Sequence, residues 1–259
     1  MKKAIYYLLM IQLMLSACLK NEESFDSFMA DWESLQIYQN VCPSVTDAVE
    51  YPEPWIPEIW NTFEISGETI NAMSTCGLLE TWLNHPAYNN SWSPYCTHCS
   101  DMSRPAFLSF NMGVSRNEVS SEFFKRRDCV PVLAFKYLTF IKAKSKPSGR
   151  QRCFEFLLAS DMSMSVSNEM EKIQFMAMAL EKMKYEKKEV NGACHIMVAI
   201  MLSCNYAPFV EEIGPKIEDS NFGYTFRNLE AGIYYSGFQD YHAKIIIEYA
   251  KQFLNEKNK

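Results

Sequence analysis

The chain of 259 residues contains only nine glycines, which is few for this length. A sheet of many strands needs tight turns, and Asn-Gly or Asp-Gly pairs commonly form them. Asn191-Gly192 is the only such pair, and it opens an apolar run instead of separating two alternating segments. The scarcity of turn residues therefore argues against a β-rich fold and favours helices.

An excess of positive charge is also missing. The 25 Lys and Arg residues are outnumbered by 31 Asp and Glu residues, which leaves a net charge of −6 at pH 7. Proteins that bind nucleic acid carry clustered basic residues, so we expect no nucleic-acid partner. The negative charge also gives no attraction to an anionic lipid surface, so any attachment of this protein to a membrane has to come from acyl chains.

Familiar catalytic motifs are absent as well. The sequence contains no His-Glu-x-x-His, no Gly-x-Ser-x-Gly and no glycine-rich phosphate loop. Cys194-His195 has the residue types of a nucleophile and its base, but adjacent residues of a helix do not face each other. We therefore expect His195 to be a core histidine, assign no catalytic residue, and expect no cofactor.

The N-terminus has a short apolar run but no long one. Met1-Lys2-Lys3 precedes an apolar stretch over 4–15 that only Gln12 interrupts. A permanent membrane helix needs ~20 apolar residues, so this stretch is too short to span a bilayer. Basic residues followed by a short apolar stretch and small residues are typical of a secretory signal peptide.

The end of this segment, Leu15-Ser16-Ala17-Cys18, resembles the lipobox of bacterial lipoproteins. The resemblance implies cleavage before Cys18 and attachment of a diacylglycerol to its thiol. It predicts a signal peptide over 1–17, a lipidated tether over 18–24, and a single mainly helical domain over 25–259. The expected location is the cell envelope, as an outer-membrane lipoprotein on its periplasmic or surface face, with the membrane as a partner.

The mature region is patterned for helices. Apolar residues recur at helical spacing, and capping residues stand before several of these stripes. Val130, Leu133, Tyr137, Leu138 and Ile141 form the most regular stripe. The predicted helices lie at about 24–39, at 67–84 after Ser66, from the capping box at 115–118, from Asp128, from the capping box at 148–151, from the capping box at 168–171, at 193–204, and from Asp240.

Two stretches differ from this pattern. Residues 51–63 hold three prolines and two tryptophans, which predicts an extended or irregular segment near the N-terminus. Residues 205–238 are less regular, with a possible small hairpin from 224–226 and 233–235. Elsewhere, helices joined by short links resemble the stacked helix pairs of HEAT- and armadillo-type repeat proteins. The predicted fold is thus all-α, as an irregular α-solenoid or an α-bundle of stacked helix pairs.

One dense cluster could carry chemistry. Cys96 and Cys99 flank Thr97-His98 inside a polar loop over 86–104. A Cys-x-x-Cys pair supplies two soft ligands of the kind that zinc sites use, and His98 is a further candidate. His85 and Cys42 could complete such a site. We favour a disulfide that holds the loop, with zinc or redox chemistry as alternatives, because exported proteins commonly form disulfides.

The remaining cysteines and the methionines are expected in the core. Free cysteine is among the most buried residue types, and methionine fills irregular gaps. Buried thiols are therefore predicted at Cys76, Cys129, Cys153, Cys194 and Cys204, with core positions for the methionines between residues 162 and 201.

The leading functional hypothesis is a lipid-anchored binding or scaffold protein that recruits a protein partner. A metal-dependent hydrolase or metal-binding protein using the Cys96–Cys99 loop is one alternative. The other is a glycan-binding surface lipoprotein that uses loop aromatics, of which Trp55, Trp60 and Trp92 are the tryptophans.

Overall fold

A computed structural model describes residues 41–42, 44–52, 63–85, 118–143, 149–185, 191–213 and 240–257. These ranges contain ten α-helices and no strand, so the all-α prediction is confirmed for this part of the chain. The helix predicted at 24–39, most of the proline-rich segment, the loop over 86–104 and the hairpin near 224–235 lie outside the described residues.

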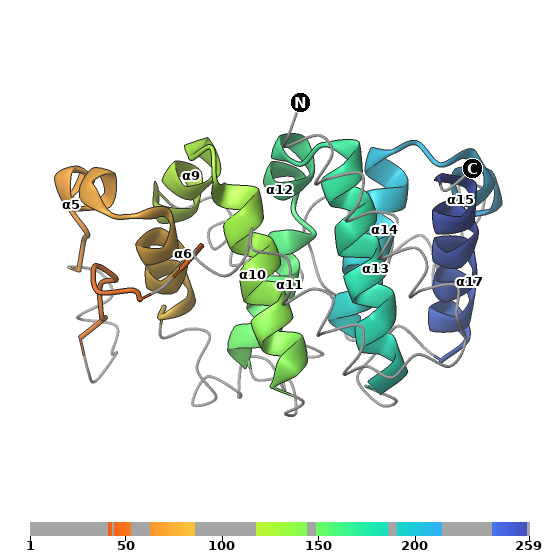
Figure 1. Ribbon diagram of the computed structural model, residues 1–259, viewed down its shortest axis with the longest axis horizontal. Coiled ribbons are helices and arrows are strands. Elements are labelled where there is room, and N and C mark those ends of the chain that lie inside the picture. Colours follow the sequence, from red (N-terminus) through yellow and green to blue (C-terminus); the bar gives the residue numbers. More distant parts are fainter. Residues whose placement is uncertain are drawn as a thin grey trace, which may run out of the picture.

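The helices are named in chain order with the labels of Figure 1. They are α5 (Gly67–Ala72), α6 (Thr75–Leu83), α9 (Glu118–Lys125), α10 (Cys129–Lys142), α11 (Gly149–Leu158), α12 (Asp161–Val166), α13 (Glu169–Tyr185), α14 (Asn191–Ser203), α15 (Ala207–Ile213) and α17 (Asp240–Lys257).

The helices stand side by side along the long axis of the molecule (Figure 1). Helices α6, α10, α13 and α17 run across this axis, from the orange end to the blue end of the colour scale. The short helices α5, α9, α12 and α15 lie along the upper edge in this view. Each long helix packs mainly on its neighbours: α6 on α9 and α10, and α17 on α13 and α14. The fold is therefore a packed helical domain whose elements follow chain order.

Helix α14 lies at the centre of the packing. It contacts α11, α12, α13, α15 and α17, and its side chains from Ala193 to Val198 are all buried. A helix that is apolar all round belongs in the interior, and this prediction is confirmed, with bounds of Asn191–Ser203 in place of 193–204. The antiparallel partner α13 begins at a capping box: the Asn168 side chain accepts from the Glu171 N–H, and the Glu171 carboxylate accepts from the Asn168 N–H.

The stripe predicted after Asp128 is confirmed, because all its members on α10 are buried. The methionines of the α12–α14 region are also core residues: Met176, Met178, Met197 and Met201 have no exposed surface. On α17, Ile246, Ala250, Phe253 and Leu254 are buried, whereas Ile245 and Tyr249 are half-buried.

The single helix predicted over 67–84 is wrong, because the structure breaks it into α5 and α6. Ser66 caps α5 as expected. Met73 and Ser74 then have extended backbone angles, with ψ of 146° and 161°. Ser74 caps α6 by accepting from the Gly77 N–H at 3.0 Å. Serine favours such a cap, but its position inside an apolar stripe concealed the break.

Two short helices are absent from the sequence-based prediction. Ser160 caps α12 by accepting from the Ser163 N–H. Helix α15 follows a turn in which Asn205 has a positive φ of 47°, a conformation that asparagine adopts more readily than most residues. Residues 205–238 were expected to be less regular, and Pro208 lies among them. It occupies the first turn of α15, where a helix tolerates proline.

The prediction of buried thiols is wrong at Cys76, is confirmed at Cys129 and Cys194, and holds only in part at Cys153 and Cys204. Cys76 is not a thiol, because it forms a disulfide with Cys42 across a Cα–Cα distance of 5.9 Å. Cys129 and Cys194 are buried thiols, as predicted. Cys153 and Cys204 are half-buried and pack against the core. The pairing with Cys42 joins segments 34 residues apart, a relation that spacing alone does not encode.

The close approach of α11 to α14 depends on a glycine, which has no side chain. Gly192 lies in the first turn of α14, and a Cβ placed there would overlap with the carboxylate of Glu155 from α11. Because Glu155 is only 1% exposed, its side chain has little room to move away. Glycine is thus required here by packing and not by backbone angles.

We predict that Gly192→Ala destabilises the protein by about 2–3 kcal/mol, because the added methyl group displaces a buried carboxylate. Gly67→Ala is the matched control. Gly67 also lies in a first helical turn, but nothing would lie within 4 Å of its Cβ. The control should be neutral or slightly stabilising, since alanine favours helix. Urea unfolding measures both; equal effects of the two substitutions would contradict the packing argument.

Candidate functional site

The sequence-predicted site residues fall into two groups. Cys18, Cys96, His98 and Cys99 lie outside the described residues. Cys42 and His85, the other candidate zinc ligands, are described. Because Cys42 is bonded to Cys76, its sulfur is no thiolate for a metal, and the prediction that it could serve as a ligand is wrong.

His85 follows the end of α6 and is half-buried. Its ring meets the Tyr51 ring edge to face at a centroid distance of 5.0 Å, and Tyr51 also packs against Phe63. Burial lowers the pKa of His85 to about 4, so the imidazole is neutral at pH 7. Across the described ranges, no three His, Cys, Asp or Glu side chains are grouped so that they could hold a metal ion.

The described chain brings ionisable side chains together in its interior, between α11, α13 and α14. Glu155 from α11 forms an ion pair with Lys182 from α13. Their side chains are 1% and 2% exposed. The beginning of α14 lies against this pair, because Gly192 leaves room for the carboxylate. Removing two charges from water is unfavourable, and the partner and further polar contacts have to compensate for it.

Two residues with reactive side chains, Cys194 and His195, follow Gly192 on α14. Burial, together with the negative charge of Glu155, raises the pKa of the Cys194 thiol to about 12. His195 is 1% exposed and meets Phe156 edge to face at a centroid distance of 5.4 Å. The prediction that His195 is a core histidine is confirmed.

This group of side chains is unsuited to nucleophilic chemistry. A thiol with a pKa near 12 stays protonated at neutral pH, and the thiolate is the reactive form. Glu155 and Lys182 are sealed from solvent in this conformation. Three more buried polar side chains come from the same two helices, namely Gln151, Gln174 and Glu181. The arrangement orients α11 and α13 relative to each other rather than presenting a site to a substrate.

A second ionic group joins three helices nearer the surface. The Glu80 carboxylate of α6 accepts hydrogen bonds from Lys136 of α10 and Arg150 of α11. All three side chains are partly exposed, so water screens the pairs. The Lys136 ammonium also lies 5.4 Å from the centre of the Phe140 ring. These ion pairs position α6, α10 and α11 relative to one another, and each adds little to the free energy of unfolding.

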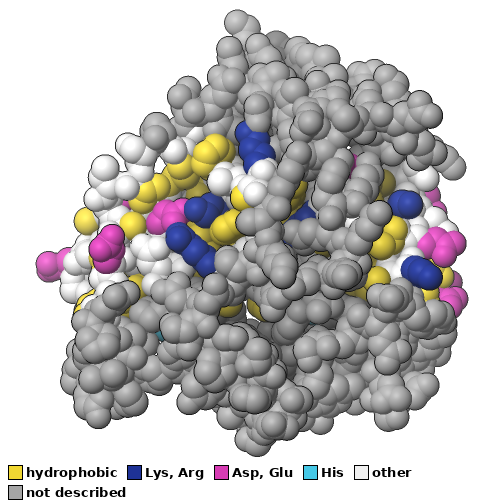
Figure 2. Space-filling view, turned by 90° about the horizontal axis from the view of Figure 1, so that it is seen from below, with side chains coloured by type: hydrophobic (Ala, Val, Ile, Leu, Met, Phe, Trp, Pro, Cys, Tyr) yellow, Lys and Arg dark blue, Asp and Glu magenta, His cyan; other side chains and the backbone are white. Residues whose placement is uncertain are grey.

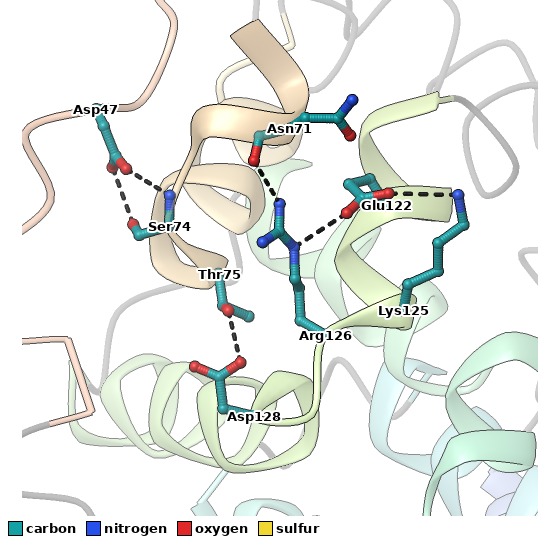
Figure 3. Close-up of polar contacts among 8 residues, drawn as sticks. All are labelled: Asp47, Asn71, Ser74, Thr75, Glu122, Lys125, Arg126 and Asp128. Atoms are coloured by element: carbon teal, nitrogen blue, oxygen red, sulfur yellow. Dashed lines mark hydrogen bonds and ion pairs between the residues drawn. The ribbon is translucent and has the colours of Figure 1, made fainter. Parts of the chain in front are cut away.

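Figure 3 shows the polar contacts where α5, α6, α9 and α10 meet. Arg126 donates to the carbonyl of Asn71 at 3.0 Å, and its Nε forms an ion pair with the Glu122 carboxylate at 3.1 Å. The helix predicted from Asp128 begins there, as α10, but the Asp128 side chain makes no capping bond to it. Its carboxylate accepts instead from the Thr75 hydroxyl at 2.6 Å, which ties the start of α10 to the start of α6.

On the other side of the same junction, the Asp47 carboxylate accepts from the N–H and the hydroxyl of Ser74 (Figure 3). The bond from the Ser74 N–H is the main reason that the pKa of Asp47 lies below its usual value. Side chains from segments far apart in the sequence therefore surround the first residues of α6.

None of these groups was found from the sequence. Glu155 stands between Phe154 and Phe156 in an apolar stretch. A lone acidic residue in such a stretch is the one feature of the sequence that could have indicated a buried carboxylate. Lys182 lies between Glu181 and Met183 and looks like an ordinary surface lysine of a helix. Its burial follows only from the way α13 packs.

Comparisons with protein-family models, with curated proteins and with solved structures find no match for this chain. None of the helices in the described part combines the length and the apolar character that crossing a bilayer requires.

We predict that Lys182→Met lowers the free energy of unfolding by about 3–5 kcal/mol, because it removes the opposite charge that compensates the buried Glu155 carboxylate. The double variant Lys182→Met/Glu155→Leu should recover most of this loss, since apolar side chains can replace a buried pair. Urea unfolding of the single and double variants gives the coupling energy.

The control is Lys257→Met, which removes the exposed pair between Lys257 and Glu169, whose side chains are 36% and 57% exposed. It should change stability by less than ~1 kcal/mol. If Lys182→Met were as mild as this control, the buried pair would not determine how α11 and α13 pack.

Proposed function

We propose that this protein is a lipid-anchored binding or scaffold protein of the cell envelope, which recruits a protein partner to its helical surface. The observation that carries the proposal is the arrangement of helices side by side along one axis (Figure 1). Such an arrangement presents a long surface made of several helices, and helical-repeat proteins use surfaces of this kind for binding.

We further propose that the helices form an irregular α-solenoid of stacked helix pairs. The contacts support it, because α10 packs on α11, α11 on α14, α13 on α14, and α14 on α17. The pair α10–α11 thus packs on the pair α13–α14, through α10 on α13 and α11 on α14, as in a stack.

The disulfide between Cys42 and Cys76 supports an exported location. Disulfides persist in oxidising compartments such as the bacterial periplasm and are rare in the cytosol. This observation is independent of the lipobox-like residues before Cys18, and both favour a protein that leaves the cytosol.

The surface charge supports a protein partner over a polyanion. Seen from below, the described side chains show lysine and arginine both near the middle and beside acidic residues at one end, with apolar side chains among the charged groups (Figure 2). Nucleic-acid binding needs a continuous basic stripe, whereas mixed charge with apolar area is typical of protein interfaces.

The lipid anchor leads to a direct prediction. Expression in a Gram-negative host with a radiolabelled fatty acid should label the protein, and Cys18→Ala should abolish both the label and retention in the membrane fraction. Cys204→Ala, which removes a half-buried thiol of the folded domain, is the control and should keep the label. Unlabelled wild-type protein in membranes would contradict the anchor.

The partner proposal is tested by photocrosslinking in intact cells. A photoreactive residue is placed in turn at Glu68, Thr139, Val166 and Glu248, which are exposed on α5, α10, α12 and α17. We expect a discrete adduct from some positions and none from others, because a specific interface covers only part of the surface. The absence of an adduct at every position, in cells where the protein is lipidated, would contradict a recruiting role.

A further inference from the structure

The segment formed by residues 41–42 and 44–52, which we term the N-terminal strap, has no helix of its own and lies against α6. Three contacts join them. Cys42 is bonded to Cys76, the Asp47 carboxylate binds Ser74, and the Val49 N–H donates to the Thr81 hydroxyl at 2.8 Å. These contacts extend from the residue that caps α6 to its third turn.

The strap also covers apolar surface. Val41, Val45 and Val49 are half-buried and pack against the hydrophobic core. Helix α6 stands near one end of the row of helices (Figure 1), and its side chains Leu78, Leu79 and Leu83 are at most 2% exposed. A stacked helical domain needs its outermost apolar surface covered, and the strap covers it at the α6 end of the described chain.

The strap further contributes to the break between α5 and α6. Asp47 Oδ2 accepts from the Ser74 N–H at 2.5 Å, and Oδ1 accepts from the Ser74 hydroxyl at 3.0 Å. The same hydroxyl accepts from the Gly77 N–H. A Cβ on Gly77 would overlap with the Asp47 carboxylate, so glycine allows the strap to approach. The extended angles at Ser74 are therefore maintained jointly by its own cap and by the strap.

Apart from the disulfide, the strap is held by hydrogen bonds, by half-buried valines and by the Tyr51 ring, which packs on His85. Asp47 and Ser74 are exposed, so water competes for their hydrogen bonds. The disulfide closes a loop of 34 residues, and by the chain-entropy relation its loss raises the population of open states by roughly 500-fold. Its reduction leaves the strap held by individually weak, non-covalent contacts alone.

We propose that the N-terminal strap is a redox-controlled clasp on α6, closed by the Cys42–Cys76 disulfide and opened by a dithiol reductant. One thiolate of the reductant attacks the Cys42 sulfur, which is more exposed than Cys76, and Cys76 leaves as a thiolate that takes up a proton. The second reductant thiol then displaces Cys42. The protein gains two electrons and two protons, and the dithiol becomes a disulfide.

Opening releases the strap and loosens α6, whereas α13 and α14 stay folded, because neither helix has a principal packing contact with α6. The clasp is independent of the proposed anchor and partner, since it rests on contacts within the domain. Its chemistry requires only an exported dithiol oxidoreductase or a small dithiol as reaction partner.

Hydrogen exchange followed by mass spectrometry tests the clasp on the full purified protein. Dithiothreitol should raise amide exchange by up to roughly 500-fold in 41–52 and α6 and leave α13 and α14 unchanged. The double variant Cys42→Ser/Cys76→Ser should show the same exchange without reductant. The control variant Cys96→Ser/Cys99→Ser retains the Cys42–Cys76 bond and should still respond to dithiothreitol.

Alkylation and mass measurement establish that Cys42 and Cys76 are reduced in the same samples. Unchanged protection of the strap and α6 after full reduction would overturn the proposal. A parallel loss of protection in α13 and α14 would also overturn it, because the disulfide would then support the whole domain. If the double variant does not fold, titration of the wild-type protein with dithiothreitol gives the same comparison.

Discussion

The buried ion pair between Glu155 and Lys182 is the constraint on which the centre of the fold depends. It joins α11 to α13, and both helices pack on α14. An apolar interface tolerates small shifts in register, whereas a buried charge has one acceptable partner. Because a partner lost from this pair leaves a charge in the core, the relative positions of α11 and α13 are narrowly defined. Gly192 permits this geometry by leaving space for the carboxylate.

At two places in the described part of the chain, an acidic side chain lies against a glycine in the first turn of a helix. Asp47 from the strap lies over Gly77 in the first turn of α6, and Glu155 from α11 lies over Gly192 in the first turn of α14. A negative charge is favourable at a helix N-terminus. The two cases differ in burial: Glu155 is sealed in the core, whereas Asp47 is exposed. Glu155 therefore helps to fix the packing of the core, whereas Asp47 lies at an end of the domain that can open.

Much of the local structure was predictable. The capping residues Ser66 and Asn168 begin helices where the sequence indicated, and the stripe on α10 is buried as its spacing requires. Three of the errors share one cause. At Ser74, Asp128 and Cys76, a residue with a plausible local role is bound by a distant segment. Local patterns carry no information about such partners, so the helix break, the unused cap and the disulfide were all missed.

The sequence by itself determined the helical class, the main apolar faces and the lipobox-like motif before Cys18, because these depend on spacing within a few residues. Tertiary structure alone decided which polar side chains are buried and which partners they have. Lys182 looks like a surface lysine until α13 packs beside α11, and Cys42 looks like a possible metal ligand until the strap meets α6. Both outcomes depend on contacts between distant residues, which the order of residues along the chain does not specify.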